Sequence, residues 1–379
     1  MISPAAKAHG LVRFVDLTAQ AAELKAEILT VIGRVIDRGD FILGEEVRLF
    51  EQEFAAYCGG AHCVGVDNGF SAVELSLRAA GIGPGDEVIT QANTFIATLS
   101  AILATGAVPV LVDCDPEGAI DPDALHAAIG PRTRAIMPVH LFGRLGDIAS
   151  VCAVAARSDV MVIEDASQAH GARRDGRPAG SFGIAAAFSF YPGKNLGAYG
   201  DAGAIVTASA ELAERARAIR DYGQRVKHLH ELVPLNRRLD TIQAAVLRIK
   251  LRHLDGWNRR RADLADAYRA GLADLPLDLP GVEPAGRHVY HLFVVGSDRR
   301  DALRAWLDAD GIESGIHYPI PCHLQPVLAH LGHRRGDFPN TERLAERSLS
   351  LPMYPELPPA QLERTVQSIR RFLLRSAAR

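Results

Sequence analysis

The sequence predicts an α/β fold, with a mainly parallel, mixed sheet buried between helices in a large domain and a smaller C-terminal α/β domain. Short runs of apolar and β-branched residues alternate with segments of helical periodicity along most of the chain. Turn sequences such as GIGPGD at 81–86 and DPEG at 115–118 separate these runs. Such alternation is typical of parallel sheets, whose strands are joined by crossover helices.

The individual elements are expected at short intervals along the large domain. We expect strands at residues 62–66, 86–91, 108–114, 133–141, 160–166, 184–190 and 203–208. Helices are expected between them, at residues 71–80, 95–105, 121–129 and 147–157. From Asp240 to Leu272 the chain has helical character with an arginine-rich face, which predicts one or two long helices.

A proline- and glycine-rich segment marks the approach to the smaller domain. It reads LADLPLDLPGVEPAG and spans residues 272–286. After it we expect a strand at 288–296, a helix at 301–311, a strand at 313–320 and a late helix. We place the large domain at residues 1–255 and the small C-terminal domain at 256–379.

Composition and charge exclude several classes of protein. The formal net charge of −3 is too small for a nucleic-acid-binding surface to be expected. Five cysteines lack the spacing of a disulfide framework, and no apolar leader opens the chain, so we expect reduced thiols and a cytoplasmic protein. The uncharged stretch 88–112 contains polar residues, glycine and proline, which favours strand–helix–strand over a membrane span. HLHEL and Cys322–His323 are incomplete metal-ligand sets, so no metal is expected.

One lysine stands in an unusual setting. Lys194 lies in the segment FSFYPGKNLGAYGDAGAIV, between Gly193 and Gly197, with aromatic residues on both sides. Aromatic walls would desolvate the ammonium ion and lower its pKa, and a neutral amine can attack a carbonyl to form a Schiff base. Pyridoxal phosphate is a cofactor that would use such an amine. The alternative is an ordinary lysine in a surface turn.

Other residues could complete a pyridoxal phosphate site. Asp165 and Gln168 follow the buried strand VMVIED, at the strand end where open α/β sheets bind ligands. Asp165 would pair with the pyridine nitrogen, and Gln168 would lie beside the ring or its 3-hydroxyl. Phe95 follows another strand end and could stack on the ring. Considered singly, Asp165 could be a helix N-cap and Phe95 a core residue.

The phosphate of such a cofactor would have donors at two further strand ends. The backbone amides of Gly69, Phe70 and Ser71 open a helix after the strand HCVGV, and helix N-termini bind phosphate. Ser189 precedes the lysine loop and supplies a hydroxyl. The alternative for residues 68–71, NGFS, is an ordinary turn that caps a helix. The coincidence of these features at successive strand ends of one sheet favours the cofactor site.

Four motifs resemble one known family. EDASQAHGA, SFYPGKNLGAYGDAGA, NRRLDTIQAAVLRIKL and GIHYPIPCHLQ are similar to those of the DegT/StrS-type sugar aminotransferases, which belong to the fold type I, aspartate-aminotransferase-like superfamily. The resemblance runs from about Val12 to Leu351. It implies a pyridoxal phosphate enzyme that transfers an amino group, usually from L-glutamate, to a nucleotide-linked keto-sugar. It also implies a homodimer with composite active sites.

The resemblance assigns roles to single residues. Lys194 matches the lysine that holds the cofactor as an internal aldimine, and Asp165 matches the partner of the pyridinium nitrogen. Asn236 matches an asparagine that reaches the phosphate from the neighbouring subunit. The family's usual NSRLD is NRRLD here, so we expect Arg237 to alter this rim of the site. The residues expected to contact the substrate are Tyr191, Arg238, His317 and Tyr318.

The motifs favour one substrate class and leave others open. They most resemble the branch that aminates C3 of dTDP-3-keto-6-deoxyhexoses. Enzymes acting on UDP-3-keto-sugars share HYPIP, and C4 aminotransferases are a further alternative. Relatives with histidine at the lysine position are dehydratases, so Lys194 favours transamination. A non-catalytic regulator or scaffold on the same fold is the non-enzyme alternative. GIGPGD stands in the wrong order for a Rossmann dinucleotide site, and no GxSxG elbow occurs.

Overall fold

The structure is a computed structural model, and it describes residues 10–283 and 286–377. The expectation that the chain lacks an N-terminal leader rests partly on residues 1–9, which lie outside these ranges, as does part of the segment 272–286. None of the helices in the described ranges combines the length and apolar character needed to cross a membrane.

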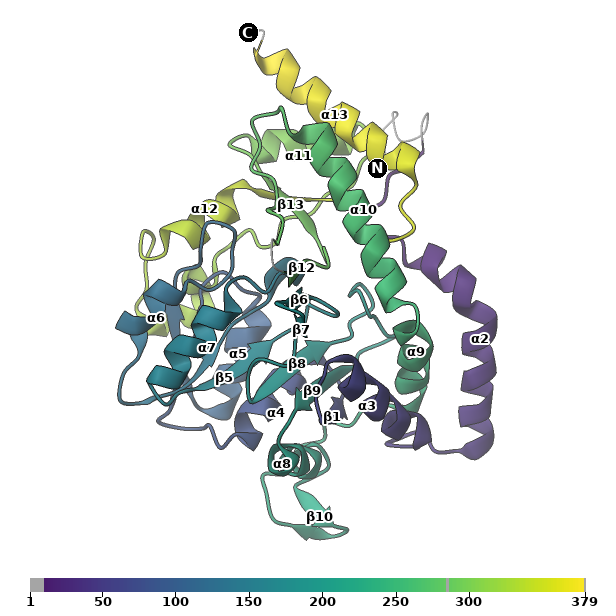
Figure 1. Cartoon of the computed structure of the whole chain (residues 1–379), viewed down its shortest axis with the longest axis vertical. Helices are drawn as coiled ribbons and strands as arrows, with labels where there is room; N and C mark the ends of the chain where they lie inside the picture. Colours follow the sequence, from purple (N-terminus) through teal and green to yellow (C-terminus); the bar gives the residue numbers. More distant parts are fainter. Residues whose placement is uncertain (1–9, 284–285, 378–379) are drawn as a thin grey trace.

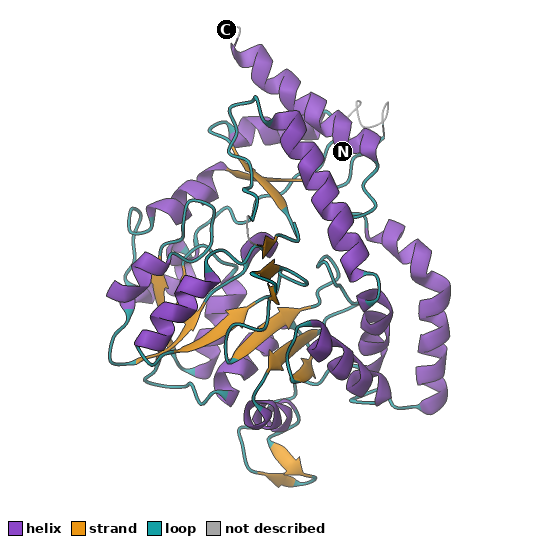
Figure 2. Cartoon of the chain, in the orientation of Figure 1, coloured by secondary structure: helices purple, strands orange, loops and turns teal. Residues whose placement is uncertain are grey.

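A mixed sheet forms the centre of the large domain (Figures 1 and 2). Among the described residues its seven strands run in the order β1-β9-β8-β5-β4-β2-β3. Strand β9 is antiparallel to both of its neighbours, and the other pairs are parallel. The strands are β1 (His62–Val66), β2 (Glu87–Gln91), β3 (Val108–Val112), β4 (Thr133–Met137), β5 (Met161–Asp165), β8 (Ala185–Ser189) and β9 (Gly203–Thr207). The predicted fold class is confirmed, with every expected strand of this sheet present.

Side chains alternate between two apolar cores, one on each face of the sheet. Ile89 and Ile136 face the core that contains helix α7, whereas Val88 and Met137 face the core that contains helices α4 and α5. This alternation follows from the two-residue period of a strand, and burial of both faces explains the continuous apolar runs. The helices of these layers are α4 (Gly69–Ala79), α5 (Ile96–Thr105), α6 (Pro122–Ala128), α7 (Ile148–Arg157) and α8 (Ala210–Arg220).

Four further helices lie at the side of the sheet where the chain passes to its C-terminal part (Figure 1). They are α2 (Leu17–Arg38), α3 (Glu45–Tyr57), α9 (Thr241–Leu251) and α10 (Leu254–Leu272). Leu24 and Ile28 of α2 pack against Val246 of α9. The long helical segment predicted from Asp240 to Leu272 is therefore two helices. Helix α10 extends from the sheet into the C-terminal part, where Tyr268 is buried.

The C-terminal part has a core of its own. Its residues include Phe293, Leu349 and Ile369, and Val12 from the N-terminal segment joins them. Two antiparallel strands pair here, and the second of them was not predicted. The elements are β13 (Phe293–Gly296), α11 (Arg300–Ala309), α12 (Pro339–Arg347), β14 (Ser348–Leu351) and α13 (Pro359–Ala377). The division of the chain at residue 255 stays a prediction.

The strand expected at 313–320 does not form as predicted. Gly315 exchanges two backbone hydrogen bonds with Ser350, and this bridge does not extend into a ladder. Pro319 has no backbone N–H and cannot continue the pairing. Downstream, the short 3₁₀ helices Cys322–Leu324 and Pro326–Leu331 return to the large domain, where Cys322 and Leu328 join the core that contains α4 and α5.

Short strands outside the central sheet and the pair of β13 and β14 form two small groups among the described residues. The hairpin of β10 (Gln224–Val226) and β11 (Leu229–His230) projects away from the sheet beyond α8 (Figure 1). Val226 is 65% exposed on it, and Leu229 is exposed as well. A second group, β6 (Arg173–Arg174), β7 (Arg177–Pro178) and β12 (Gly286–Arg287), joins the segment that leads into the C-terminal part to the large domain.

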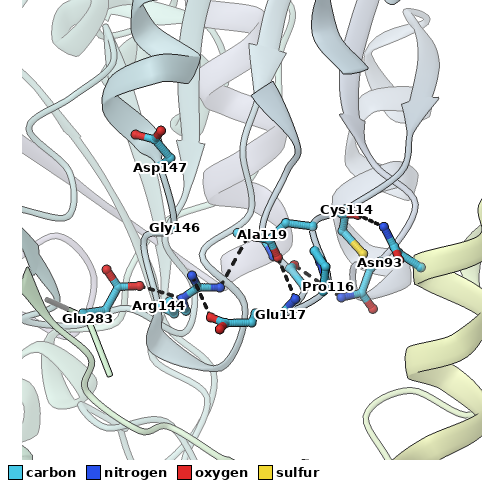
Figure 3. A network of polar contacts seen from close by, with 12 residues as sticks. Asn93, Cys114, Pro116, Glu117, Ala119, Arg144, Gly146, Asp147 and Glu283 are labelled. Atoms are coloured by element: carbon cyan, nitrogen blue, oxygen red, sulfur yellow. Dashed lines mark hydrogen bonds and ion pairs between the residues drawn. The ribbon is translucent and has the colours of Figure 1, made fainter. Parts of the chain in front are cut away.

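A polar network fixes the segment before β12 to the large domain (Figure 3). Glu283 is buried and accepts hydrogen bonds from Arg144 at 2.6 Å and from Arg174 at 3.2 Å. Arg144 also pairs with Glu117 at 2.8 Å. Because a buried carboxylate is stable only when it is paired, these contacts hold the two parts of the chain in one arrangement.

Candidate active site

The lysine loop connects β8 to β9 at the carboxyl end of the parallel strands. The Lys194 amide donates to the carbonyl of Tyr191 at 2.8 Å, and the Ala198 amide donates to the carbonyl of Phe190 at 2.8 Å. Burial lowers the pKa of the Lys194 amine to about 8, while the nearby Asp165 carboxylate acts in the opposite direction. Lys194 is therefore partly desolvated, as the sequence predicted.

The aromatic residues around Lys194 differ from the predicted wall. Phe188 and Phe190 are fully buried and pack edge-to-face against Phe54, beneath the loop. Tyr191 is 60% exposed, and Tyr199 is also exposed. Phe188 in β8 and Phe190 just after it point to the same side of the extended chain, into the core, so the desolvation of Lys194 does not come from four flanking rings.

Asp165 is the last residue of β5, and its carboxylate has two partners. Oδ2 accepts a hydrogen bond from the Thr98 hydroxyl at 2.7 Å, and Oδ1 accepts one from the Ser167 amide at 3.2 Å. Thr98 lies in the first turn of α5, which follows β2. A buried carboxylate with a donor on each oxygen suits a partner that carries a positive charge.

Gln168 contacts Tyr318, which in turn packs against Phe95. Its Oε1 accepts from the Phe142 amide at 2.7 Å, and its Nε2 donates to the Tyr318 hydroxyl at 3.4 Å. The Tyr318 ring lies against Phe95 with centroids 5.1 Å apart. Burial raises the pKa of Tyr318 to about 12, so the phenol is protonated at neutral pH. Phe95 is half exposed rather than a core residue, which leaves ring surface free for a ligand.

The predicted phosphate donors also come together. Gly69 is the first residue of α4, and a Cβ placed on it would lie 2.4 Å from Cβ of Ser189 and 2.9 Å from its Oγ. The helix N-terminus and the serine hydroxyl are therefore in contact. The side chain of Asn68 caps the helix by accepting from the Ser71 amide at 2.9 Å. The amides of Gly69 and Phe70 belong to the first helical turn, whose N–H groups have no acceptor within the helix.

His317 lies beside this group of residues. Its Nδ1 is 2.8 Å from Oγ of Ser350, and its ring stacks on Phe14 with centroids 5.7 Å apart. Burial, together with the charge of Lys194, lowers the pKa of His317 to about 4. The imidazole is therefore neutral at physiological pH. It can accept or donate a hydrogen bond there without carrying a charge.

Asn236 and Arg238 lie in the segment that leads into α9, and Arg238 forms an isolated antiparallel bridge with Val66, the last residue of β1. Asn236 bridges to Asp221, and Arg238 pairs with the same aspartate at 3.3 Å and lies over the Tyr222 ring. Within the described ranges, no hydrogen bond or ion pair connects either residue to Lys194 or to its neighbours. The structure of one chain thus gathers most of the predicted residues but not these two.

Some residues of the site were not identified from the sequence. Thr98 follows Phe95 by one turn in ANTFIAT, so its position after a strand end was the signal available. Asn195 follows Lys194 and is buried. Its Nδ2 donates to Asn258 and to the Val289 carbonyl, both at 2.9 Å, and its Oδ1 is 3.2 Å from His291. No sequence pattern indicates those partners.

A cavity of about 410 Å³, lined in part by Phe142, lies between the large domain and the C-terminal part. Its lining includes Arg343 and Arg347, and both arginines are paired with Asp278. Lys194 and Asp165 do not line it. The chemistry of the lysine loop therefore belongs to the strand ends and not to this cavity.

The arrangement fits pyridoxal phosphate. An amine with a lowered pKa, a buried carboxylate and a set of phosphate donors occur at the carboxyl ends of β8, β5 and β1 of the same sheet. The contact between Gly69 and Ser189 leaves no room for a side chain, so backbone and hydroxyl donors can meet one anion. The aldehyde, the ring nitrogen and the phosphate of the cofactor each have a complementary group.

Comparison with known proteins agrees with this chemistry. The model of the DegT/DnrJ/EryC1/StrS aminotransferase family matches residues 22–370. A dTDP-3-amino-3,4,6-trideoxy-alpha-D-glucose transaminase from Streptomyces venezuelae is 50% identical over 363 residues, which cover 95% of this chain and 96% of the relative. A UDP-N-acetyl-3-dehydro-alpha-D-glucosamine 3-aminotransferase from Acidithiobacillus ferrooxidans is 46% identical, covering 95% of this chain and 97% of that relative.

A solved structure supports the same relationship. The crystal structure of S. venezuelae DesV in complex with a ketimine intermediate has a TM-score of 0.94 and 49% identity. The match covers 96% of this chain and 98% of DesV. The chain therefore belongs to the DegT/DnrJ/EryC1/StrS aminotransferase family and is a pyridoxal-phosphate-dependent sugar aminotransferase.

Proposed function

We propose that the protein transfers the amino group of L-glutamate to C3 of a dTDP-linked 3-keto-6-deoxyhexose. The observation that carries the proposal is the 50% identity, over nearly the whole chain, to a transaminase named for a dTDP-3-amino-trideoxyglucose. The tightly packed strand ends that hold Lys194 and Asp165 are compatible with this reaction.

Lys194 is proposed as the residue that bonds to the cofactor and moves the proton. Pyridoxal phosphate, when bound, supplies an aldehyde and an electron-accepting ring. With a pKa of about 8, the Lys194 amine is readily neutral when it is free. It would then move a proton from the amino-bearing carbon of the donor to C4′ of the cofactor, and in the reverse direction when the keto-sugar is aminated.

Asp165 and its neighbours are proposed to orient the cofactor. The Asp165 carboxylate, held by Thr98, would keep a protonated ring nitrogen in place. Gln168 would lie at the ring edge, and the exposed face of Phe95 would stack on the ring. Proposed phosphate ligands are Ser189 and the amides of Gly69 and Phe70. The amide of Ser71, which the sequence also suggested, already donates to the side chain of Asn68.

The sugar pocket is proposed to combine residues from two subunits. Tyr191, His317 and Tyr318 would contact the substrate from the chain that supplies Lys194. Asn236 and Arg238 would reach the phosphate and the substrate from the neighbouring subunit of a homodimer. Within the described ranges neither residue makes a hydrogen bond or ion pair with the Lys194 group, which is compatible with this division. The exposed side chains of Val226 and Leu229 on the hairpin of β10 and β11 are apolar surface that a partner subunit would cover.

The nucleotide is the least constrained part of the proposal. The relative that aminates a UDP-linked sugar is 46% identical, so a UDP-3-keto-sugar is the second candidate. A C4-keto-sugar is a third possibility from the sequence motifs. We further propose a cytoplasmic location and a domain boundary at residues 255–256.

The proposal is tested by assaying purified holoenzyme with L-glutamate and a panel of keto-sugars. The panel contains dTDP-3-keto-6-deoxyhexoses, UDP-3-keto-2-acetamido sugars and dTDP-4-keto-6-deoxyhexoses, and 2-oxoglutarate release is measured. We expect the highest kcat/KM with a dTDP-3-keto-sugar. A higher value with the UDP or the 4-keto compound would replace the proposed substrate and leave the transamination itself intact.

A further inference from the structure

The residues next to Lys194 in its loop are held from behind by helices α9 and α10. Lys250, on α9, donates from Nζ to the carbonyl of Gly197 at 2.5 Å. It is only 2% exposed. Gly197 lies three residues after Lys194, and a Cβ on it would lie 2.3 Å from the carbonyl oxygen of Pro192, so the loop is tightly folded there. The contact with Lys250 thus closes the C-terminal side of this tight turn.

A buried lysine needs an explanation. Burial lowers the pKa of Lys250 to about 8, because transfer of an ammonium ion from water into the interior is unfavourable. No carboxylate is within ion-pairing distance among the described residues, and Glu356 acts on it only electrostatically. The rings of Tyr199 and Trp257 lie 5.3 Å and 5.9 Å from Nζ. A methionine would fill this space without the charge, but it could not donate the hydrogen bond to the carbonyl of Gly197. The amine is therefore the part of the side chain that contacts the loop.

A second contact holds the loop on the side nearer the lysine. Asn258, on α10, is 1% exposed and accepts at Oδ1 from Nδ2 of Asn195, at 2.9 Å. Its own Nδ2 donates to the carbonyl of His170 at 2.8 Å. His170 lies five residues after Asp165. Asn258 therefore connects the residue after Lys194 to the segment that follows Asp165.

We propose that Lys250 and Asn258 are positioning residues that hold the lysine loop so that the Lys194 amine meets the cofactor carbonyl. The proposal rests on the assignment of Lys194 as the residue that bonds to the cofactor. Two glycines, Gly193 and Gly197, would otherwise leave the loop backbone free to move. A reacting group displaced by about 1 Å can lose about a hundredfold in rate, even when the altered residue does not touch the substrate.

The experiment measures bond formation separately from turnover. Apo-protein is prepared from wild type, Lys250→Met, Asn258→Ala and Lys194→Ala, with Lys25→Met as the control for loss of an exposed lysine. Each is mixed with pyridoxal phosphate, and the absorbance change of the lysine-bound cofactor is followed in time. Cofactor affinity, circular-dichroism melting, and kcat and KM for the sugar are measured in parallel.

We expect Lys250→Met and Asn258→Ala to bind the cofactor but bond to it at least about tenfold more slowly. Their kcat should fall while KM changes little, and Lys25→Met should match wild type. Wild-type rates of bond formation in both variants would overturn the proposal. Failure of both to fold would also overturn it, by assigning the two residues to stability. If only one of the two variants folds, its rate of bond formation decides whether the proposal stands. Normal bond formation by Lys194→Ala would instead refute the proposed role of Lys194.

Discussion

The hydroxyl of Thr98 donates a 2.7 Å hydrogen bond to the carboxylate of Asp165. Both residues are buried, and they come from different crossover units, at the first turn of α5 and at the end of β5. The hydroxyl is positioned by a further contact, because Oγ1 of Thr94 lies 2.8 Å away from it. A short chain of hydroxyl groups thus fixes the orientation of the carboxylate that acts electrostatically on Lys194.

Removal of the Thr98 hydroxyl should lower kcat. Hydrogen bonds to charged groups contribute about 1.5–3 kcal/mol, which corresponds to roughly ten- to hundredfold in a rate constant. Thr98→Val preserves the shape of the side chain and removes the donor, so we expect a loss in this range in steady-state assays. Thr98→Ser retains the hydroxyl and should recover most of the rate. Equal activity of the valine and serine variants would contradict a role for this hydrogen bond.

Bond formation between Lys194 and the cofactor should depend on pH in a defined direction. Only the neutral amine is a nucleophile, and its fraction rises as pH rises through the pKa of about 8. We therefore expect the rate for apo-protein to increase between pH 6 and 9, with a midpoint near 8. Stopped-flow absorbance across this range measures it. A midpoint near the ordinary lysine value of 10.5 would show that the amine is not desolvated.

A methyl group at residue 69 should weaken cofactor binding. In Gly69→Ala the new Cβ would overlap Ser189, and overpacking of this kind costs about 1–3 kcal/mol. We expect the dissociation constant for pyridoxal phosphate to rise by about tenfold or more, measured by equilibrium dialysis. Gly33→Ala is the matched control, because a Cβ there, within α2, meets nothing within 4 Å. Equal effects of the two substitutions would argue against a shared site at Gly69 and Ser189.

The sequence predicted most of the large domain because its strands are short, apolar and separated by clear turns. The same reasoning located Asp165, Ser189, Phe95 and Gly69, since each follows or ends a strand of a sheet whose carboxyl edge binds ligands. The structure brings Phe95 to Tyr318 and Gly69 to Ser189, two contacts that lie between segments far apart in the sequence. Strand order, which no local pattern specifies, determines such pairs.

Prediction failed where tertiary contacts outweigh local pattern. The residues 313–320 have the composition of a strand, but the bridge between Gly315 and Ser350 does not extend into a ladder, and Pro319 has no backbone N–H to donate to one. Tyr191 and Lys194 are neighbours in the loop, but Tyr191 turns to solvent. Lys250 lies in a helix whose pattern indicates only an amphipathic surface. Its contact with Gly197 exists because α9 packs beneath a loop more than fifty positions earlier in the chain.

Mixed subunits offer a test of the composite site. Lys194→Ala removes the bonding amine, and Asn236→Ala removes the proposed phosphate ligand of the neighbouring site. Each variant alone should be impaired, the first completely. In a mixed dimer, one site would combine the intact Lys194 of one subunit with the intact Asn236 of the other, so activity should reappear after co-expression or after denaturation and joint refolding.

The controls for this experiment follow from the same geometry. A double variant, Lys194→Ala with Asn236→Ala, mixed with wild-type chains should leave no site that is restored by exchange. Differently tagged subunits allow mixed dimers to be purified before assay. Because Asn236 has no contact with the Lys194 group in one described chain, restoration in the mixed dimer is the outcome that requires two subunits per site. If purified mixed dimers of the two single variants show only the residual activity of Asn236→Ala, each site uses residues of a single chain.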